Sequence, residues 1–497
     1  MYYPNINEYK ILAKKGNLIP VYREILADTD TPVSAYIKIQ QTQSFLLESL
    51  SNDEKWARYS FIGLKPKKII KSWGESVEIT ENGSSPIIKH FDDPIAALKQ
   101  ELSNYVPVTV EGLPPFYGGL VGYIGYENVK YFERCPDNNK SGVAIPDMCF
   151  LLTDTLLIFD HHKLTIKIVV NTYVTDNINI EDAYIEALTK IDQIEHSLKH
   201  NKINYKTCAA IKNNDGDIAY SSSFDTKQDF MDAVEKSKEY IKAGDIFQVV
   251  LSQRFNTKSD VDPFNIYRAL RIINPSPYMF YLNLDDVKLV GASPEILVRK
   301  RQDKVILRPI AGTRKRGLNE EEDLSLEKEL LTDPKELAEH IMLVDLGRND
   351  VGRVARAGSI LINKLKFIER YSHVMHIVSD IEGTLQQGLD SFDVLRACFP
   401  AGTVTGAPKV RAMEIINELE PVKRGPYAGA VGYFSFSGDM DTCITIRTLF
   451  VKDGTIYFQA GAGIVADSIA ENEFEETLNK ARAIMRAIKM AQEELCY

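Results

Sequence analysis

The sequence predicts an α+β fold in which mainly antiparallel strands are interspersed with helices. Residues 73–79 and 164–170 largely alternate apolar and polar side chains, which is typical of half-buried strands. A meander of three further strands is expected at 428–436, 442–451 and 455–460, with a tight hairpin at Asp453-Gly454. Such antiparallel strands argue against a doubly wound parallel sheet.

The first part of the chain, to about residue 173, has the pattern of strands and turns with few long helices. A helix is expected at 181–199, because its apolar residues recur on one side. The polar stretch 201–217 is the best candidate for a linker, so we divide the sequence into regions 1–205 and 220–497.

The second part has clearer helix signals. Helices are expected at 230–243 (ending at Gly244), 333–350, 405–419 and 473–494, with a strand at 247–255. Asp333 is predicted to cap the second of these helices, Pro334 suits its first turn, and Glu336 has the spacing of a capping box.

Composition limits the class of protein. With 497 residues, 44% of them hydrophobic, the chain can bury a large core in two to four domains, or in fewer if one fold is unusually large. A net charge of −10 without a long basic run argues against a nucleic-acid partner. No apolar stretch approaches the ~20 residues of a membrane span, and residues 1–10 do not resemble a signal peptide. We therefore expect a soluble, cytoplasmic protein.

Cysteine and histidine patterns argue against zinc, disulfides and nucleophilic hydrolysis. The six cysteines form no C-x-x-C pair, which favours reduced thiols. His373 and His376 have no metal-binding spacing, and a lone histidine there would usually be a packed, hydrogen-bonded residue. The chain has no nucleophile-elbow motif.

Two acidic sets could bind a hard cation. Glu336 and Glu339 are three residues apart on one expected helix, and Glu473, Glu476 and Lys480 share one face of another. Carboxylates in such sets are the oxygen ligands that Mg²⁺ prefers. Spacing alone, however, favours a solvated charged face with Glu–Lys pairs.

Arg447 and several glycine turns suggest an anion site. Arg447 lies in an otherwise uncharged expected strand, and a buried guanidinium needs either a structural carboxylate or a substrate carboxylate as its partner. Backbone N–H groups of glycine turns can bind anions, although most such turns are only turns. The candidates are Pro309 to Thr313, Gly402-Thr403 with Thr405-Gly406, and Gly461-Ala462-Gly463. Together these residues indicate a Mg²⁺-and-arginine pocket for a small polyanion that spacing cannot name.

The sequence resembles the chorismate-utilising enzymes over about residues 229–493, through many separate motifs in order. They are Gly291 to Glu295, Pro309 to Thr313, Glu339 to Asp350, Ser372 to His376, Gly402 to Lys409, Asp441 to Arg447 and Gly461 to Gly463. The N-terminal half resembles the anthranilate synthase component I group of that family, through Leu46 to Ser49, Arg58 to Ser60 and Gly118 to Tyr123.

This resemblance implies a fold and a set of site residues. The expected fold has four layers, α/β/β/α, with two orthogonally packed, mainly antiparallel sheets to which both halves contribute. Glu339 and Glu476 match the family's Mg²⁺ ligands, supported by Glu336 and Glu473. The positions that match chorismate contacts are Gly312, Thr313, Tyr427, Arg447, Gly461, Ala462 and Gly463. Catalytic or pocket positions are Glu295 as general acid, His376 near the leaving group, Thr403 and Lys480.

The implied reaction joins chorismate and ammonia to give anthranilate and pyruvate. Related enzymes that use water carry a lysine base where this chain has Gln248, and many 4-amino-4-deoxychorismate synthases carry a lysine nucleophile where it has Ala311. Both differences favour anthranilate. The alternatives are a 4-amino-4-deoxychorismate synthase large subunit and, more remotely, a silent tryptophan-sensing subunit, which would not need the full acidic, arginine and histidine set.

The resemblance also implies a partner and an inhibitor. Family members of this length obtain ammonia from a glutamine amidotransferase subunit, in a heterotetramer. Two segments match the halves of the family's tryptophan site, at Glu48, Ser49, Asn274, Pro277, Tyr278 and Met279. Ordinary packing of a strand on a proline-rich turn is what spacing alone would favour, and the paired motifs favour tryptophan. Pro277, Tyr278 and Met279 are expected to line an apolar pocket together.

Overall fold

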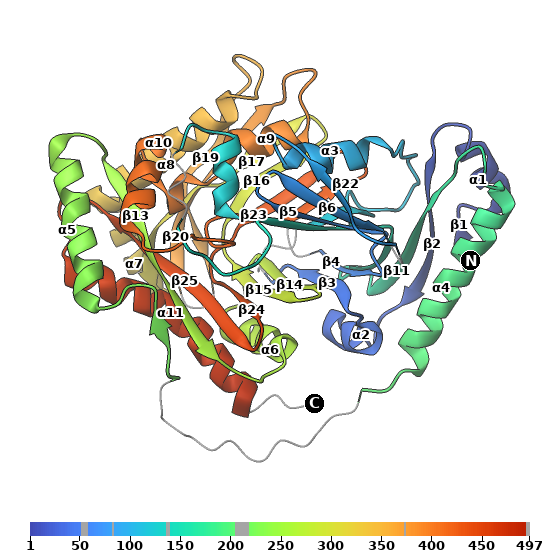
Figure 1. Cartoon of the computed structure of the whole chain (residues 1–497), viewed down its shortest axis with the longest axis horizontal. Helices are drawn as coiled ribbons and strands as arrows, with labels where there is room; N and C mark the ends of the chain where they lie inside the picture. Colours follow the sequence, from blue (N-terminus) through green and yellow to red (C-terminus); the bar gives the residue numbers. More distant parts are fainter. Residues whose placement is uncertain (51–57, 82–83, 136–139, 204–217, 372–373, 494–497) are drawn as a thin grey trace.

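Two large antiparallel sheets form the centre of the molecule (Figure 1). The computed structural model describes residues 1–50, 58–81, 84–135, 140–203, 218–371 and 374–493. Most of the predicted linker, together with Ser372, His373 and the end of the last helix, lies outside these residues. None of the described helices has the length and apolar character needed to cross a membrane.

The first sheet contains, in spatial order, β1 (Tyr2–Tyr3), β2 (Leu18–Leu26), β11 (Thr165–Tyr173), β10 (Thr155–Asp160), β4 (Tyr59–Leu64), β3 (Gln43–Glu48), β14 (Tyr278–Leu284), β15 (Val287–Ser293), β24 (Thr448–Lys452), β25 (Thr455–Ile464), β13 (Gln248–Lys258) and β12 (Ser221–Ser222). The short β21 (Gly406–Ala407) also pairs with β13.

The second sheet contains β18 (Ile310–Lys315), β20 (Val374–Thr384), β17 (Lys304–Leu307), β16 (Ile296–Arg301), β23 (Met440–Ile444), β22 (Ala430–Ser435), β8 (Gly119–Ile124), β9 (Met148–Thr153), β5 (Lys68–Trp73), β6 (Ser76–Glu81) and β7 (Ile87–His90). On the other side of β20 lies β19 (Leu361–Arg370). The strand expected at 73–79 begins only at Ser76, because the β5–β6 turn occupies residues 74 and 75.

Helices lie outside both sheets (Figure 1). They are α1 (Ile6–Leu12), α2 (Pro32–Ile39), α3 (Ile95–Ser103), α4 (Ile180–His200), α5 (Lys227–Ala243), α6 (Pro263–Ile273), α7 (Glu320–Thr332), α8 (Pro334–Gly352), α9 (Ser391–Cys398), α10 (Lys409–Leu419) and α11 (Ala470–Glu493), with 3₁₀ turns η1 (Tyr126–Tyr131) and η2 (Gly402–Val404). One apolar core fills the space between the sheets, and another lies under α2, α4, α6 and α11. The predicted α+β class with two antiparallel sheets and outer helices is confirmed.

Both sheets contain strands from the two halves of the sequence. In the first sheet β3 pairs with β14, so that Glu48 lies opposite Met279. In the second, β8 pairs with β22, with Leu120 opposite Phe434. Regions 1–205 and 220–497 are therefore joined by backbone hydrogen bonds in two separate places.

The expected three-strand meander is wrong, because the chain changes sheet inside residues 442–451. It leaves the second sheet at Ile444 and enters the first sheet at Thr448. Arg447, between them, has a positive φ of 51°, which an extended strand does not have. The hairpin at Asp453-Gly454 is confirmed between β24 and β25.

A second change of sheet lies beside this one. The chain passes from β15 to β16 through Pro294 and Glu295. Since β15 pairs with β24 and β16 pairs with β23, the two crossings run side by side. The Ile444 N–H donates to the Glu295 carbonyl at 3.0 Å, and the Ser293 hydroxyl donates to the Ile444 carbonyl at 2.7 Å. These bonds fix the crossings to each other.

One predicted helix start and one predicted capping box need correction. The helix expected from Thr405 begins at Lys409, because Gly406 and Ala407 pair with β13 instead. Asp333 caps α8 as predicted, accepting from the N–H groups of Lys335 and Glu336. No reciprocal bond from the Glu336 side chain completes a capping box, since that carboxylate accepts from Arg314 at 3.1 Å.

A buried ion pair lies between the crossings and α10. Arg424 and Glu420 are each 2% exposed, and the Arg424 Nε donates to the Glu420 carboxylate at 2.9 Å. The same guanidinium donates to the carbonyls of Val404 and Val250, both at 2.8 Å. Three separate segments therefore depend on one side chain.

We expect Arg424→Met to lower the free energy of unfolding by about 3–5 kcal/mol, because it leaves Glu420 buried without its partner. Arg411→Met removes another arginine of the same region, one that pairs with the half-buried Asp245, and should cost about 1 kcal/mol or less. Urea unfolding followed by circular dichroism compares the two. Equal midpoints for both variants would contradict the structural role of Arg424.

Candidate active site

A pocket of about 790 Å³ opens where the two crossings meet. Residues from both crossings line it, as do residues of β13, β18, β20, β25, α8 and α11. The predicted site residues that it brings together are Glu295, Gly312, Thr313, Glu336, Glu339, His376, Thr403, Tyr427, Arg447, Gly461, Gly463, Glu473, Glu476 and Lys480. Their positions in the sequence span 186 residues, from 295 to 480.

Ala462 was predicted to contact the substrate, but it does not line the pocket. It lies on β25 between Gly461 and Gly463, which both face the pocket. Because side chains alternate along a strand, the Ala462 methyl group points to the opposite face, where it is fully buried in the core.

The four predicted metal ligands come from two helices. Glu336 and Glu339 belong to α8, and Glu473 and Glu476 belong to α11. Burial raises the pKa of Glu339, and the neighbouring Glu336 and Glu476 raise it further. Burial and Glu476 likewise raise the pKa of Glu473. The two helices therefore concentrate negative charge at one end of the pocket.

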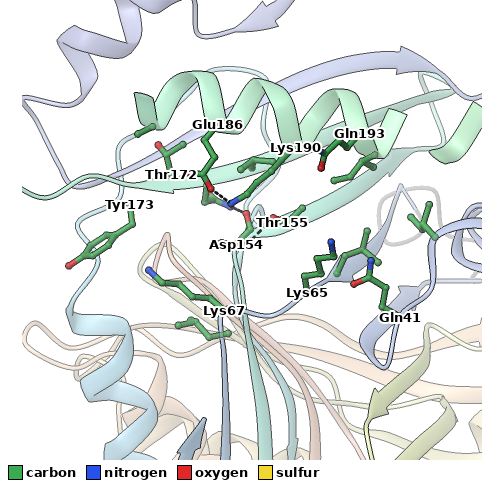
Figure 2. A pocket seen from close by; sticks show the side chains of 18 of the residues that line it. Gln41, Lys65, Lys67, Asp154, Thr155, Thr172, Tyr173, Glu186, Lys190 and Gln193 are labelled. Atoms are coloured by element: carbon green, nitrogen blue, oxygen red, sulfur yellow. Dashed lines mark hydrogen bonds and ion pairs between the residues drawn. The ribbon is translucent and has the colours of Figure 1, made fainter. Parts of the chain in front are cut away.

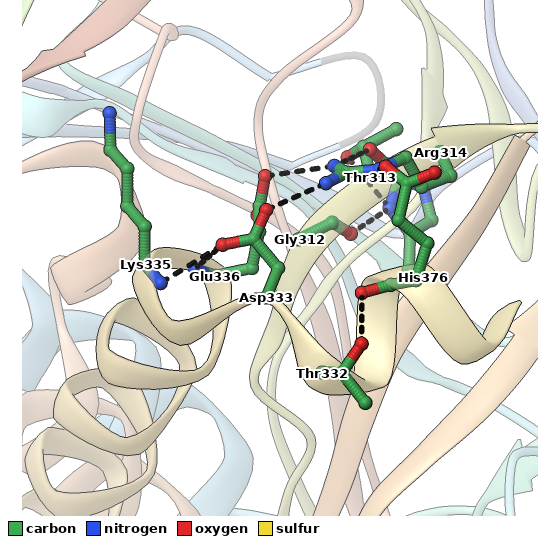
Figure 3. A network of polar contacts seen from close by, with 9 residues as sticks. Gly312, Thr313, Arg314, Thr332, Asp333, Lys335, Glu336 and His376 are labelled. Atoms are coloured by element: carbon green, nitrogen blue, oxygen red, sulfur yellow. Dashed lines mark hydrogen bonds and ion pairs between the residues drawn. The ribbon is translucent and has the colours of Figure 1, made fainter. Parts of the chain in front are cut away.

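Two of these carboxylates already have cationic partners. Arg314 donates to Glu336, as Figure 3 shows, and Lys480 donates to Glu476 at 2.6 Å and to the Gly461 carbonyl at 2.9 Å. No ion pair is formed by Glu339 or Glu473 within the described part of the chain. The described residues contain no group of three acidic, histidine or cysteine side chains already drawn together around a metal position.

The donor chemistry nevertheless fits a hard divalent cation. All four groups offer oxygen atoms, and the pKa values of Glu339 and Glu473 are raised by burial and, to a smaller extent, by neighbouring carboxylates, so a bound cation would favour their charged forms. Gln248 orients one of them, because its side-chain amide donates to Glu339 at 3.4 Å. A cation held here would need fewer ligands from the protein if it kept water or took oxygen atoms from a substrate.

Arg447 offers the pocket a cation without a protein counterion. Burial lowers the pKa of its guanidinium, while Tyr427 and Glu476 oppose that shift. No carboxylate of the described residues lies within ion-pair distance of Arg447. Among these residues, therefore, nothing supports the alternative that a carboxylate of the protein itself is its partner. A planar guanidinium at a pocket wall can hold a carboxylate through two parallel hydrogen bonds.

Glu295 is the most strongly perturbed acid of the pocket. It is 8% exposed, and burial raises its pKa to about 8, with the Thr403 hydroxyl opposing the shift. At neutral pH the side chain is therefore mainly a neutral carboxylic acid, which can give up a proton. Its backbone belongs to the β15–β16 crossing, which backbone hydrogen bonds join to the crossing that carries Arg447.

His376 lies against the turn of β18 (Figure 3). Its Nδ1 is 3.0 Å from both the Gly312 carbonyl and the Thr313 hydroxyl. Because a carbonyl only accepts, Nδ1 carries the proton and Nε2 keeps a lone pair. Burial and the Arg447 charge lower the pKa of His376. The ring is thus a neutral group that can accept a proton at Nε2.

Glycine is needed where the pocket backbone comes close to other groups. Gly312 has a φ of 70°, and a Cβ there would lie 3.1 Å from Glu336. A Cβ on Gly461 would lie 2.7 Å from the Tyr427 hydroxyl. Larger residues at either position would displace a side chain that lines the pocket.

Sequence reasoning missed several lining residues. Lys335 lies directly before Glu336, and its position in the first turn of α8 was a usable signal. Arg314, which no motif indicated, does not line the pocket itself but donates to Asp333 as well as to Glu336. No local pattern indicated Tyr371, Gln459 or Ser468, which also line the pocket.

The two predicted halves of the tryptophan site lie on adjacent strands. Glu48 lies directly opposite Met279, and it accepts a hydrogen bond from Tyr267 and an ion pair from Arg271 at 2.9 Å, both on α6. The Ser49 hydroxyl is buried and has no hydrogen-bond partner in the described part of the chain. The structure therefore brings together Glu48, Ser49 and Met279.

Other residues of that set point elsewhere. Tyr278 and Met279 are neighbours on β14 and face opposite sides of the sheet, so they cannot line one pocket together. The Tyr278 hydroxyl donates to Asp441 at 2.9 Å. Asn274 lines the pocket described above, beside Pro275 and Ser276.

Known proteins resemble the chain over its whole length. A family model described as chorismate binding enzyme matches residues 15–486. Anthranilate synthase component 1 of Acetivibrio thermocellus is 48% identical over 497 residues, covering 99% of this chain and 100% of that protein. The same component of Aquifex aeolicus is 48% identical, covering 98% of both chains.

Solved structures agree with these relatives. Anthranilate synthase component I from Streptococcus pneumoniae TIGR4 superposes with a TM-score of 0.76 at 34% identity, covering 93% of this chain and 99% of that one. The menaquinone-specific isochorismate synthase of Escherichia coli, at 18% identity and a TM-score of 0.70, shares the fold over 97% of this chain and 98% of its own. The chain belongs to the family of chorismate-binding enzymes.

Proposed function

We propose that the chain is the chorismate-using large subunit of anthranilate synthase, a lyase that converts chorismate and ammonia into anthranilate and pyruvate. The observation that supports this most directly is one pocket that combines a neutral Glu295, an unpaired Arg447 and four carboxylates. Full-length relatives with the name anthranilate synthase component 1 support the same assignment. The enzyme would act in the cytoplasm, at the first step from chorismate to tryptophan.

Two carboxylates of chorismate need two cationic regions. Arg447 holds the enolpyruvyl carboxylate in a bidentate contact, supported by N–H groups of Gly461 and Gly463. Glu339 and Glu476 would hold Mg²⁺ as direct ligands, with Glu336 and Glu473 in support. When bound, the metal would neutralise the ring carboxylate and draw electron density from C2.

Glu295 and His376 would then move protons. As ammonia bonds to C2, the C4 hydroxyl leaves, and the neutral Glu295 carboxyl donates the proton that makes it water. In the second stage the ring loses pyruvate and a proton. The neutral His376 has a free Nε2 lone pair that can take that proton, a role that refines the leaving-group assistance implied by the resemblance.

Ala311 and Gln248 favour anthranilate over its alternatives. Both line the pocket, and neither side chain can act as an amine nucleophile or as a base toward water. Ammonia must therefore reach C2 itself. A glutamine amidotransferase subunit, joined in a heterotetramer, would supply it, and the name component 1 of the relatives is consistent with a second component.

Product identity tests the proposal. The purified chain, given chorismate, Mg²⁺ and ammonium, should form anthranilate, detected by its fluorescence, and pyruvate in equal amounts. Glutamine should replace ammonium only after the partner subunit is added. Accumulation of 4-amino-4-deoxychorismate as the main product would instead support the alternative enzyme.

The metal assignment predicts a selective effect of carboxylate removal. Glu339→Gln should lower kcat/KM at least about 100-fold and raise the Mg²⁺ concentration needed for half-maximal rate, because a charged ligand is lost. Glu471→Gln, on another face of α11, outside the pocket and paired with Lys227, is the control. Equal Mg²⁺ dependence in both variants would disprove the assignment.

The raised pKa of Glu295 predicts that the catalytic rate is lost at alkaline pH. Its acid form is the active form, so kcat should fall as pH rises through about 8, measured at constant free ammonia. Glu295→Gln cannot donate a proton and should lower kcat by about 10²–10⁴-fold while removing that pH dependence. If kcat of the Glu295→Gln variant still fell as pH rises through about 8, another group would be responsible for that fall.

Tryptophan inhibition predicts a different pattern. We propose that tryptophan binds beside Glu48, Ser49 and Met279, and that it weakens chorismate binding because the Leu50 N–H donates to the Ser276 carbonyl, in a loop that lines the substrate pocket. Ser49→Phe should fill the space and raise the inhibitory concentration about tenfold or more, whereas Ser49→Ala should change it little. Steady-state rates with and without tryptophan measure the inhibition of each variant. Unchanged inhibition in Ser49→Phe would show that tryptophan binds elsewhere.

A further inference from the structure

A second cavity of about 740 Å³ is lined mainly by residues of the N-terminal half (Figure 2). The helix α4 covers one side of it, and the ends of α2, β4 and β11 form much of the remaining wall. It shares no described lining residue with the chorismate pocket. Its size is within the range of small-molecule sites.

Lys67 gives this cavity a cation without a protein counterion. Its ammonium group lies 4.5 Å from the ring centre of Tyr173 and 5.5 Å from that of Tyr105. Burial lowers the pKa of Lys67. Within the part of the chain that the structure describes, no carboxylate lies within 4 Å of this nitrogen. Aromatic faces attract the cation, and Asp154 and Glu81 oppose the lowering of its pKa from a longer distance, but neither carboxylate forms an ion pair with it.

The other lysines of the cavity are less suited to bind an anion. Lys190 is paired with Glu186 at 2.8 Å, a contact drawn in Figure 2, and Lys38 is paired with Asp30 at 2.7 Å. Lys65 is exposed at the rim. A ligand with one negative charge therefore matches the site better than a phosphate with several charges, which would need more free cations.

Two buried acceptors lack sufficient donors. Asn171 is 3% exposed, and its Nδ2 donates to the carbonyls of Tyr117 and Asp154, which fixes the orientation of the amide. Its Oδ1 has no donor in the described part of the chain. Burial raises the pKa of the Asp154 side chain, which accepts from Thr155 at 2.9 Å. An N–H or O–H group of a ligand would satisfy such acceptors.

Apolar side chains complete the lining between these polar groups. They are contributed mainly by Leu18, Leu64, Leu152, Val170, Ile194 and Phe436. Together with Tyr105 and Tyr173 they provide a surface for a flat, apolar body.

We propose that this cavity binds an aromatic acid that carries a hydroxyl or amino group. Its carboxylate pairs with Lys67, its ring packs against the apolar lining, and its donor reaches Asp154 or the Asn171 Oδ1. The ligand class follows from one free cation, the unsatisfied acceptors and the aromatic walls.

Binding of 3-hydroxybenzoate to the full chain tests the proposal by calorimetry. The Arg447→Met background weakens carboxylate binding at the other pocket. Affinity should fall at least tenfold for 3-hydroxybenzamide, which lacks the charge, and fall less for benzoate, which lacks the donor. Lys67→Met should lower the affinity for 3-hydroxybenzoate at least tenfold, and Lys67→Arg should retain it. Lys163→Met, an exposed lysine on the β10–β11 turn outside the cavity, is the matched control.

A second measurement does not depend on the folding of any variant. In the wild-type chain, 3-hydroxybenzoate should slow acetylation of Lys67 by acetic anhydride at least threefold relative to Lys163, as read by mass spectrometry. Equal acetylation rates with and without the ligand, or an affinity unchanged by Lys67→Met, would overturn the proposal.

Discussion

The site depends on one constraint: two neighbouring chain segments both pass from one sheet to the other. A strand normally continues in its own sheet, and its side chains then face one core or the other. At Pro294-Glu295 and at Thr445 to Arg447 the backbone instead passes from one sheet to the other. Pro294, Glu295, Ile446 and Arg447 of these segments line the pocket. An acid and a guanidinium are thereby carried into one pocket by neighbouring segments that backbone hydrogen bonds join.

The charged groups around these segments are of two kinds: some are paired within the protein, and others face the pocket. Arg424 is buried with Glu420 and also donates to the backbone carbonyls of Val404 and Val250, so its charge is paired within the protein. Among the residues that the structure describes, Arg447 in the pocket wall has no such partner, and Glu339 accepts a hydrogen bond from the Gln248 amide but forms no ion pair. Because unpaired buried charges are costly, the unpaired groups are those for which a ligand is the missing partner. The same argument separates the paired Lys190 from Lys67 in the second cavity.

Much of the fold class and of the site could be predicted from the sequence, and the errors have physical reasons. The acidic residues of α8 and α11 were visible because helical spacing puts them on one face, but spacing could not say that the two helices meet. Arg447 was recognised as an unusual charge in an apolar segment. Its place at a sheet crossing could not be predicted, since both flanking segments have ordinary strand patterns. Ala462 was included by motif alone, although strand alternation already indicated that its methyl group faces away from Gly461 and Gly463.

The pairing of early with late strands has a consequence for how the chain is made. Leu120 of β8 finds its partner Phe434 only after more than three hundred further residues have been synthesised, and Leu46 of β3 must wait for Tyr281. During translation the N-terminal strands therefore leave the ribosome with open edges and apolar faces. Contacts so distant in sequence slow folding and favour aggregation of incomplete chains. Neither half has a complete sheet of its own, so a truncated product of translation would expose surfaces that chaperones and proteases recognise.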